Sequence, residues 1–315
     1  MGRFLLRKAP SVLMVLIAAS IIAFSLPRLA PGDPATAAAG PDASAAQVEA
    51  IRQQLGLDEP VVTQYWDWIR GVFTGNLGQS YIYNRPVSEV ISARVGSTLE
   101  LAALAAIIMI IVGLSLGTLA GSNRSRWARG MLDGTNTILL AVPPFVTGLL
   151  LILIFGIAFR LLPVSGEVSL ISDPAIGIQY LILPAIALAL PQAAVIARLV
   201  QSSMLQARSE DFVDLATAKG VAPRRITVRH VLRNSVGTAV VAIGLRLGEL
   251  LGGAIVIEAI FARNGLGALA VSSVQNRDYL VLQTLILGAV FIAVAIQLLT
   301  EIVLAGLDPR VRLGA

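Results

Sequence analysis

Long apolar blocks with few charges constrain this chain more than any other feature of its sequence. Hydrophobic residues make up 56% of its 315 residues, and charged residues make up only 14%. About 20 apolar residues in a helix cross a bilayer core about 30 Å thick, because each residue advances 1.5 Å. Six blocks are long enough, so the sequence predicts an all-α polytopic membrane protein. The predicted spans are 9–29, 98–121, 131–158, 178–199, 235–257 and 280–304.

Consecutive prolines interrupt the third predicted span. Pro143 and Pro144 lack backbone N–H groups, and their rings clash with the preceding helical turn. We therefore expect this span to be broken or sharply kinked.

Basic residues predict how the spans are oriented. Arg3, Arg7 and Lys8 precede the first span, and the loops after spans two and four are rich in arginine. Cytoplasmic loops of membrane proteins carry such an excess of Lys and Arg. We therefore expect both termini to be cytoplasmic. The same asymmetry explains the net charge of +5, so no nucleic-acid partner is expected.

The predicted spans divide the chain into four parts. We expect the first span to be retained as an anchor, because three prolines separate its apolar run from any signal-peptide cleavage site. The parts are 1–30 (cytoplasmic start and first span), 31–97 (extracytoplasmic segment), 98–305 (five-helix core with a cytoplasmic loop at 201–234) and 306–315 (cytoplasmic tail).

The extracytoplasmic segment contains two predicted helices. Ser44 and Gln47 have the spacing of a capping box at the start of the first helix. Pro60 is expected in the first turn of the second. This second helix carries three aromatic residues, which we expect at the membrane interface or packed against the first helix. They are Tyr65, Trp66 and Trp68.

Two predicted spans carry a glycine at every fourth position. In membrane helices this spacing lets another backbone approach closely. We therefore expect two tight packing faces, within the chain or with a second subunit. The glycines are Gly113, Gly117 and Gly121 in the second span, and Gly244, Gly248 and Gly252 in the fifth.

Three polar residues inside predicted spans are candidates for lining a translocation path. A charge at the middle of a membrane helix costs about 2.5–3.5 kcal/mol, so such residues are functional candidates. Arg246 and Glu249 lie three residues apart in the fifth span and can form an ion pair. This pair could instead serve only helix packing. Gln283 in the sixth span is a weaker candidate.

Residues for catalysis or metal binding are not evident in the sequence. Cysteine is absent, His230 is the single histidine, and no phosphate-binding loop, HExxH motif or carboxylate cluster with metal spacing occurs. We therefore expect a chain that is not an enzyme and has no cofactor of its own. Energy from ATP would have to come from a partner.

The loop after the fourth span has the pattern of a helix, a turn and a second helix. Ser209 is the expected N-cap, with Glu210 and Asp211 in the first turn, where the helix dipole favours acids. Gly220 is expected to end this helix, and Pro223 to begin the next. A basic stripe of Arg225, Arg229 and Arg233 then follows. Lipid headgroups account for part of this stripe, but the capped helix favours a protein-docking element.

This loop carries a family resemblance. The stretch "EDFVDLATAKGVAPRRITVRHVLRNS" resembles the EAA loop of binding-protein-dependent ABC importer permeases. The stretches "LAPGDPA", "STLEL", "LLPVSG", "GGAIVIEAIFARNGLGAL" and "DPRVR" are similar to the B-type permease subunit of dipeptide and oligopeptide importers. The resemblance extends over essentially the whole chain and implies the type I ABC importer permease fold.

The resemblance implies a permease subunit of an ATP-driven peptide importer in the bacterial plasma (inner) membrane. Its implied partners are a second, similar permease chain, two ATPase subunits that bind ATP and Mg²⁺, an extracytoplasmic substrate-binding protein, the peptide and membrane lipid. Same-fold importers of nickel chelates or glutathione remain alternatives. A stand-alone secondary transporter is another, although no internal repeat is evident.

The resemblance also implies a role for the first helix of the loop, which in this family fits a cleft in the ATPase. Where the family usually has arginine, threonine and arginine, this chain has Asp214, Leu215 and Thr217, so we expect a dedicated ATPase. The implied coupling residues are Glu210, Asp211, Asp214, Ala216, Ala218, Lys219 and Gly220.

Overall fold

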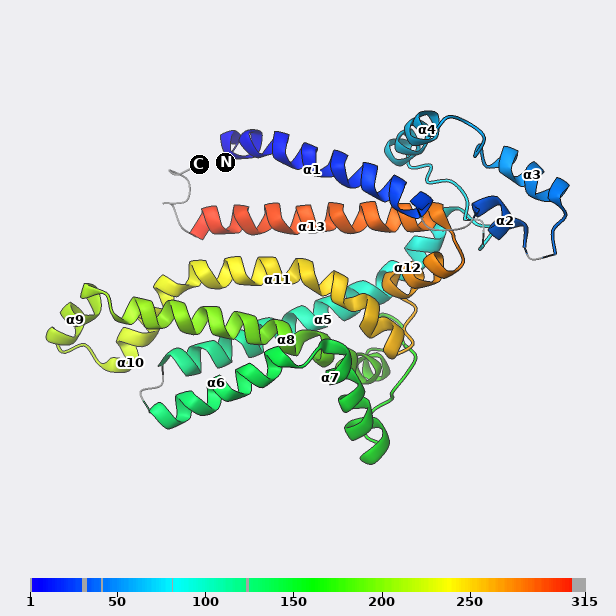
Figure 1. Ribbon diagram of the computed structural model, residues 1–315. Coiled ribbons are helices and arrows are strands. Elements are labelled where there is room, and N and C mark those ends of the chain that lie inside the picture. Colours follow the sequence, from blue (N-terminus) through cyan, green and yellow to red (C-terminus); the bar gives the residue numbers. More distant parts are fainter. Residues whose placement is uncertain (1, 30–32, 41, 81, 123–124, 308–315) are drawn as a thin grey trace. The chain divides into compact units, whose positions relative to one another are not determined.

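The computed structural model describes residues 2–29, 33–40, 42–80, 82–122 and 125–307, and the end of the predicted tail, with the "DPRVR" stretch, lies outside them. In these ranges the regular elements are helices (Figure 1). The elements are α1 (Gly2–Leu29), α2 (Pro34–Ala39), α3 (Ala45–Gln54), α4 (Val61–Thr74), α5 (Val87–Ser122), α6 (Arg126–Ala141), α7 (Pro144–Leu151), η1 (Ile152–Ala158), α8 (Pro174–Arg208), α9 (Asp211–Ala218), α10 (Pro223–Arg225), η2 (Ile226–Val231), α11 (Leu232–Ile260), α12 (Leu266–Gln275) and α13 (Tyr279–Leu307).

Five of these helices are long and apolar enough to cross a membrane, or six if the bent pair α6–α7/η1 counts as one span. The helix α5 begins at Val87, earlier than the predicted span, because its first turns carry Glu89 and Arg94 and do not read as apolar. Contacts divide the chain into two compact units. The first contains Leu99–Arg263 and the chain from Ala295 onward, and the second contains Gly2–Thr98 and Asn264–Val294.

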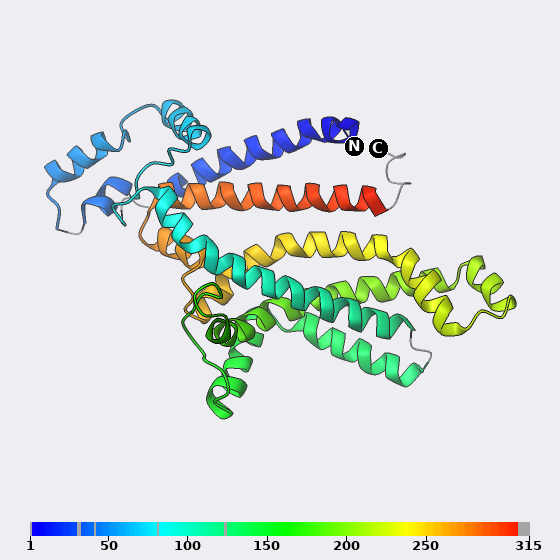
Figure 2. The ribbon, with the colours of Figure 1, turned by 180° about the vertical axis from the view of Figure 1, so that it is seen from behind.

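The helix α8 forms the centre of the first unit. In its most apolar stretch 61% of the residues are buried, compared with 22% in that of α5, so α8 is the helix that the others cover. Figures 1 and 2 show α6, α11 and the later part of α5 alongside it. Many of its buried positions are alanines, such as Ala185, Ala189 and Ala193, which let neighbouring helices come close.

The first glycine face lies against α8. A Cβ atom on Gly113 would lie 2.9 Å from the Ala193 carbonyl oxygen, and one on Gly117 would lie 2.7 Å from the Ala197 carbonyl oxygen. A Cβ atom on Gly121 would meet Met204 at 2.9 Å. Glycine at these three positions therefore allows α5 to approach the backbone of α8.

The predicted break in the third span is confirmed. Helix α6 ends at Ala141, and α7 begins at Pro144 after a bend of 100°. Val142 between them is extended, with φ −88° and ψ 118°, as expected for a residue that precedes proline. The short helix α7 continues into the π-helical turn η1.

The second unit joins α1 to α4. Phe24 of α1 packs against Tyr65 and Trp68 of α4, and the Tyr65 hydroxyl lies 2.8 Å from the Ser20 hydroxyl. Trp66 remains 64% exposed. Of the two expected placements, packing against the preceding helix is not observed, because α3 has no buried residue and Tyr65 and Trp68 pack against α1.

The structure confirms one of the two predicted helix starts in the segment 31–97 and shifts the other by one position. Ser44 and Gln47 form the predicted capping box of α3. Pro60 is the N-cap of α4 and not a residue of its first turn. The Asp33 carboxylate begins α2 by accepting hydrogen bonds from the backbone N–H groups of Ala35 and Thr36, and it forms a 2.6 Å ion pair with Arg52 of α3.

Candidate functional site

The short helix α9 follows directly on the end of α8 (Figure 1). Ser209 does not begin α9 as expected. It ends α8, where its backbone N–H and its hydroxyl both donate to the Gln206 carbonyl. Glu210 takes the N-cap position of α9, with Asp211 and Asp214 in the first turn. The sequence did not reveal this because α8 extends well beyond the apolar span.

Helix α9 has two distinct faces. Phe212, Val213 and Ala216 point inward and pack against the core of the first unit. The opposite face is exposed and consists of Asp211, Asp214, Leu215 and Ala218. Leu215 is 57% exposed and stands among the acidic side chains. We call these four residues, together with the exposed Glu210, the outer face of α9.

Gly220 ends α9 as predicted. Its φ of 73° lies in the left-handed region that glycine adopts readily. Its N–H donates to the Thr217 carbonyl (2.9 Å), and the Val221 N–H donates to the Ala216 carbonyl (3.1 Å). These two bonds form a Schellman motif, in which Val221 also packs on the core that contains Ala216. The end of α9 is therefore tied to the body of the unit.

A partly buried arginine at the end of α8 holds the loop in place. The Arg208 guanidinium donates to the Thr227 hydroxyl (2.9 Å) and to the Ser122 carbonyl at the end of α5 (3.3 Å). One side chain thus joins α8, η2 and α5. The sequence indicates only that Arg208 is a basic residue of the loop, because the partners of a long side chain cannot be read from its position.

The second helix of the loop begins at Pro223, as predicted, but it is not separate from span five. The chain runs from α10 through the π-helical turn η2 directly into α11. The stripe of Arg225, Arg229 and Arg233 is exposed along this continuous rod. Continuous helical structure therefore joins the loop to α11.

Arg246 and Glu249 form the expected ion pair on α11. The Arg246 guanidinium also lies 3.5 Å from the Gln192 side-chain oxygen of α8. The side chains of Arg246 and Glu249 are 24% and 49% exposed. This pair therefore does not belong to the packed interior of the first unit.

The second glycine face differs from the first. Gly244 closely opposes Thr300 of α13. A Cβ atom on Gly248 or Gly252 would meet nothing within 4 Å. Within the described residues, only the first of these glycines contacts another helix closely.

The first unit contains a cluster of charged residues around the buried Arg263, and no pattern in the sequence pointed to this cluster. Arg263 is 2% exposed, and its guanidinium lies 3.5 Å from a Glu167 carboxylate oxygen. Burial lowers the pKa of Arg263, and the charges of Glu167, Glu100 and Glu258 partly offset this effect. Glu100 also accepts hydrogen bonds from the Ser169 hydroxyl and the Leu170 N–H. The cluster fixes the loop before α8 to α5 and to the end of α11.

Gln283 belongs to the second unit, whereas Arg246 and Glu249 belong to the first. Its side chain is 1% exposed, and its Nε2 atom lies 3.4 Å from the Phe24 carbonyl oxygen. It lines a cavity between α1, α4 and α13. The three predicted path candidates are therefore not brought into one cluster by the contacts of either unit.

These features define a polytopic membrane protein in which a short exposed helix is continuous with the spanning helices. The chain matches two families along nearly its whole length. Residues 113–313 match the binding-protein-dependent transport system inner membrane component, and residues 1–102 match the N-terminal family of the same membrane component. The chain belongs to this family and is a permease subunit of an ABC importer. This assignment removes the stand-alone secondary transporter as an alternative.

Several curated relatives cover almost all of the chain. A probable peptide ABC transporter permease protein of Sinorhizobium fredii is 37% identical over 99% of this chain and 100% of its own length. A putative peptide transport system permease protein of Brucella abortus is 36% identical over 99% of both. A glutathione transport system permease protein of Escherichia coli is 35% identical over 99% of both.

A solved structure supports the fold. The inward-facing MetNI methionine ABC transporter contains a chain that matches with a TM-score of 0.58 and 17% identity, over 70% of this chain and 96% of that chain. At this identity the likeness concerns the fold alone, which is the expected type I permease fold.

Proposed function

We propose that this chain is the permease subunit of a peptide importer and that the outer face of α9 docks into an ATPase subunit. The observation that carries the proposal is the pair of faces on α9. One face is packed into the first unit, and the other presents Leu215 between acidic residues to solvent. An exposed apolar side chain at the centre of a polar rim is typical of a protein-binding surface.

Peptide as the substrate is supported by the relatives in Sinorhizobium and Brucella, which are described as peptide permeases. The Escherichia coli relative is described as a glutathione permease, and glutathione is itself a modified tripeptide. Glutathione is therefore the second candidate. Uptake assays with trialanine and with glutathione separate the two.

The charges on α11 support a second permease chain as partner. Arg246 and Glu249 lie near the middle of the apolar stretch Gly237–Ile260. A charge that faces lipid at this depth costs about 2.5–3.5 kcal/mol, and the cost falls when protein or water covers it. We infer that a second permease chain covers this face, with the ion pair at the edge of the translocation path.

We assign α9 and both termini to the cytoplasm, and the segment between α1 and α5 to the outside of the inner membrane, where a substrate-binding protein delivers the peptide. The exposed arginines Arg225, Arg229 and Arg233 follow α9 and support this orientation. Under this assignment, α9 is on the ATPase side.

Coupling then follows from the way α9 is attached. The Schellman motif at Gly220 packs the end of α9 onto the core of the first unit, and the Arg208 bonds join α8, which leads into α9, to η2 and α5. The continuous rod from α10 to α11 extends from this joint into the membrane. ATPase closure can rock the spanning helices if it binds α9 differently in its open and closed states.

The test compares two exposed apolar residues of the same loop. Leu215 and Val228 are 57% and 58% exposed, but only Leu215 lies on the outer face of α9. Complexes with Leu215→Asp or Val228→Asp are reconstituted in proteoliposomes with ATP inside and binding protein outside. We expect Leu215→Asp to lower trialanine uptake by about tenfold or more, which corresponds to about 1.4 kcal/mol of lost docking energy, and Val228→Asp to retain it. Equal uptake by the two variants would refute the docking role.

A further inference from the structure

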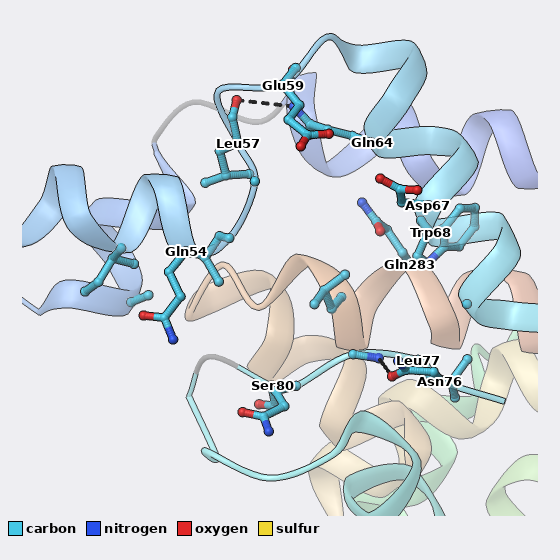
Figure 3. A pocket seen from close by; sticks show the side chains of 18 of the residues that line it. Gln54, Leu57, Glu59, Gln64, Asp67, Trp68, Asn76, Leu77, Ser80 and Gln283 are labelled. Carbon is cyan, nitrogen blue, oxygen red and sulfur yellow. Dashed lines mark hydrogen bonds between the residues drawn. The ribbon is translucent and has the colours of Figure 1, made fainter. Parts of the chain in front are cut away.

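A cavity of about 690 Å³ lies inside the second unit, between the end of α1, the α3–α4 segment, the loop before α5 and the start of α13 (Figure 3). Its volume is within the range of about 300–1,000 Å³ that small-molecule sites occupy. Trp68, Asp67 and Gln283 belong to its lining. All lining residues belong to this unit, so the cavity does not depend on the first unit.

Two buried polar groups in the lining have no hydrogen-bond partner among the described residues. They are the Trp68 indole N–H and the Gln283 side-chain oxygen. Trp68 is 8% exposed and Gln283 is 1% exposed, so bulk water does not readily satisfy them. Buried polar groups in proteins are almost always paired. One donor and one acceptor in the same cavity therefore indicate a ligand that supplies one of each.

The charges of the lining favour a cationic group on that ligand. Glu59 and Asp67 contribute carboxylates. The lining has one guanidinium, Arg28, and it is already engaged by the Gln64 side-chain oxygen (2.9 Å) and the Phe24 carbonyl (2.8 Å). Figure 3 shows the Asp67 carboxylate and the Gln283 amide in the same part of the cavity, with Trp68 beside them. The two carboxylates thus outnumber the single guanidinium in the lining.

We propose that this cavity binds the amino-terminal end of a short peptide. The ammonium group is bound by the Asp67 carboxylate and the Gln283 oxygen, and a peptide carbonyl accepts from the Trp68 indole N–H. A bare metal ion fits less well, because it offers nothing to an N–H donor, and no cluster of metal-binding side chains occurs among the described residues. Leu77 and Leu280 provide apolar contact for a side chain of the peptide.

The proposal rests on the proposed function, because its ligand is the substrate of that function, and it adds a site that receives the peptide on the outside. Gln283, near the start of α13, then lies where the peptide first meets the permease. The site would select for a free amino terminus.

The test measures binding of trialanine and N-acetyl-trialanine to the purified complex in nanodiscs, without binding protein, by isothermal titration calorimetry. The variants are Asp67→Asn and Gln283→Leu, and the matched control is Asp58→Asn, an exposed acid of the same segment that does not line the cavity. We expect trialanine to bind at least about tenfold more tightly than the acetylated peptide, a difference that Asp67→Asn abolishes. Gln283→Leu should weaken trialanine binding, and Asp58→Asn should leave it unchanged.

Asp67 is exposed, so Asp67→Asn remains informative even if Gln283→Leu fails to fold. No trialanine binding by the wild-type complex, or equal binding of the two peptides, overturns the proposal. A loss of binding-protein affinity in Asp67→Asn without any loss of trialanine binding also overturns it, since the cavity then receives a segment of that protein. Peptide uptake by the same wild-type complex in proteoliposomes tests the proposed function separately. Normal uptake alongside any of these results refutes the cavity site alone.

Discussion

Gly117 and Gly248 occupy equivalent positions in the two glycine motifs, yet substitution by alanine should change the stability of the subunit differently at the two positions. Gly117 of α5 lies against α8, where an added Cβ atom would be 2.7 Å from the Ala197 carbonyl oxygen and 2.8 Å from the Val200 Cβ atom. Gly248 of α11 has nothing within 4 Å of an added Cβ atom. We predict that Gly117→Ala destabilises the isolated subunit and that Gly248→Ala does not.

The size of the difference follows from the contacts. Both substitutions exchange glycine for alanine inside a helix, so the helix-propensity gain of about 1 kcal/mol is common to both. At Gly117 the opposing atoms are backbone or Cβ atoms, which cannot move aside by changing rotamer. Overpacking of this kind costs about 1–3 kcal/mol. The free energies of unfolding of the two variants should therefore differ by about 1–3 kcal/mol, with Gly117→Ala the less stable.

The assay is unfolding of the purified subunit in mixed micelles, titrated with sodium dodecyl sulfate and followed by circular dichroism. The isolated subunit is required, because a partner that covers Gly248 would add its own packing cost. Equal unfolding midpoints for the two variants would show that α5 and α8 do not approach each other as closely as the structure indicates.

Three further predictions concern charges and a helix end. Glu249→Gln leaves Arg246 without its ion-pair partner. We expect the rate of peptide-stimulated ATP hydrolysis to change by about tenfold, equivalent to about 1.4 kcal/mol. If only the thermal stability changes, the ion pair serves helix packing and not the translocation path. Burial raises the pKa of Asp33, but its local hydrogen bonds and the charge of Arg52 outweigh this and lower the pKa below 3.8. Ionised Asp33 therefore stabilises its segment above pH 3.8, and this stabilisation is lost as the pH falls through the pKa of Asp33 in the folded protein. A ¹³C NMR titration of labelled aspartate should place the midpoint for Asp33 below 3.8. A midpoint at or above 3.8 would contradict the observed contacts. Gly220→Ala adds no clash but forces an L residue to φ 73°. It should therefore destabilise the end of α9 by about 1–2 kcal/mol. Amide hydrogen exchange at residues 211–221 should become faster, and unchanged exchange would contradict this strain.

The sequence predicted the fold well where the signal is local or depends on composition. Pro143 and Pro144 predicted the bend before α7, and Ser44 with Gln47 predicted the start of α3, because each effect acts within a few residues. Long apolar blocks predicted the spans, since crossing a bilayer requires a minimum length.

Features that depend on distant partners could not be predicted in this way. The two glycine motifs are equivalent as spacing patterns, yet only the one containing Gly117 is opposed by another helix at every glycine. Ser209 has the identity of an N-cap, but the length of α8 makes it the end of that helix. Arg208 and Arg263 gave no signal beyond their charge, because their roles come from residues more than a dozen positions away.

The sequence predicted the helical elements of the loop more completely than the surroundings of the path candidates. Asp211, Asp214 and Ala218 share one face of α9 because they are three or four positions apart in a helix, and Phe212, Val213 and Ala216 pack inward on the other face. The path candidates differ, because a polar residue inside an apolar span signals only that it needs a partner. For Gln283 this partner includes α1, which no pattern in the sequence connects with α13.

The contact between α9 and the ATPase can be measured most directly at Ala218, on the outer face. The chain has no cysteine, so a photoactivatable maleimide on Ala218→Cys labels a single position, and Val228→Cys serves as the control. Irradiation of the assembled complex should yield an adduct with the ATPase subunit from position 218 and far less from position 228, and formation of this adduct should stop ATP-driven peptide uptake. An adduct that lacks the ATPase, or full uptake by the cross-linked complex, would contradict the role of α9 in coupling.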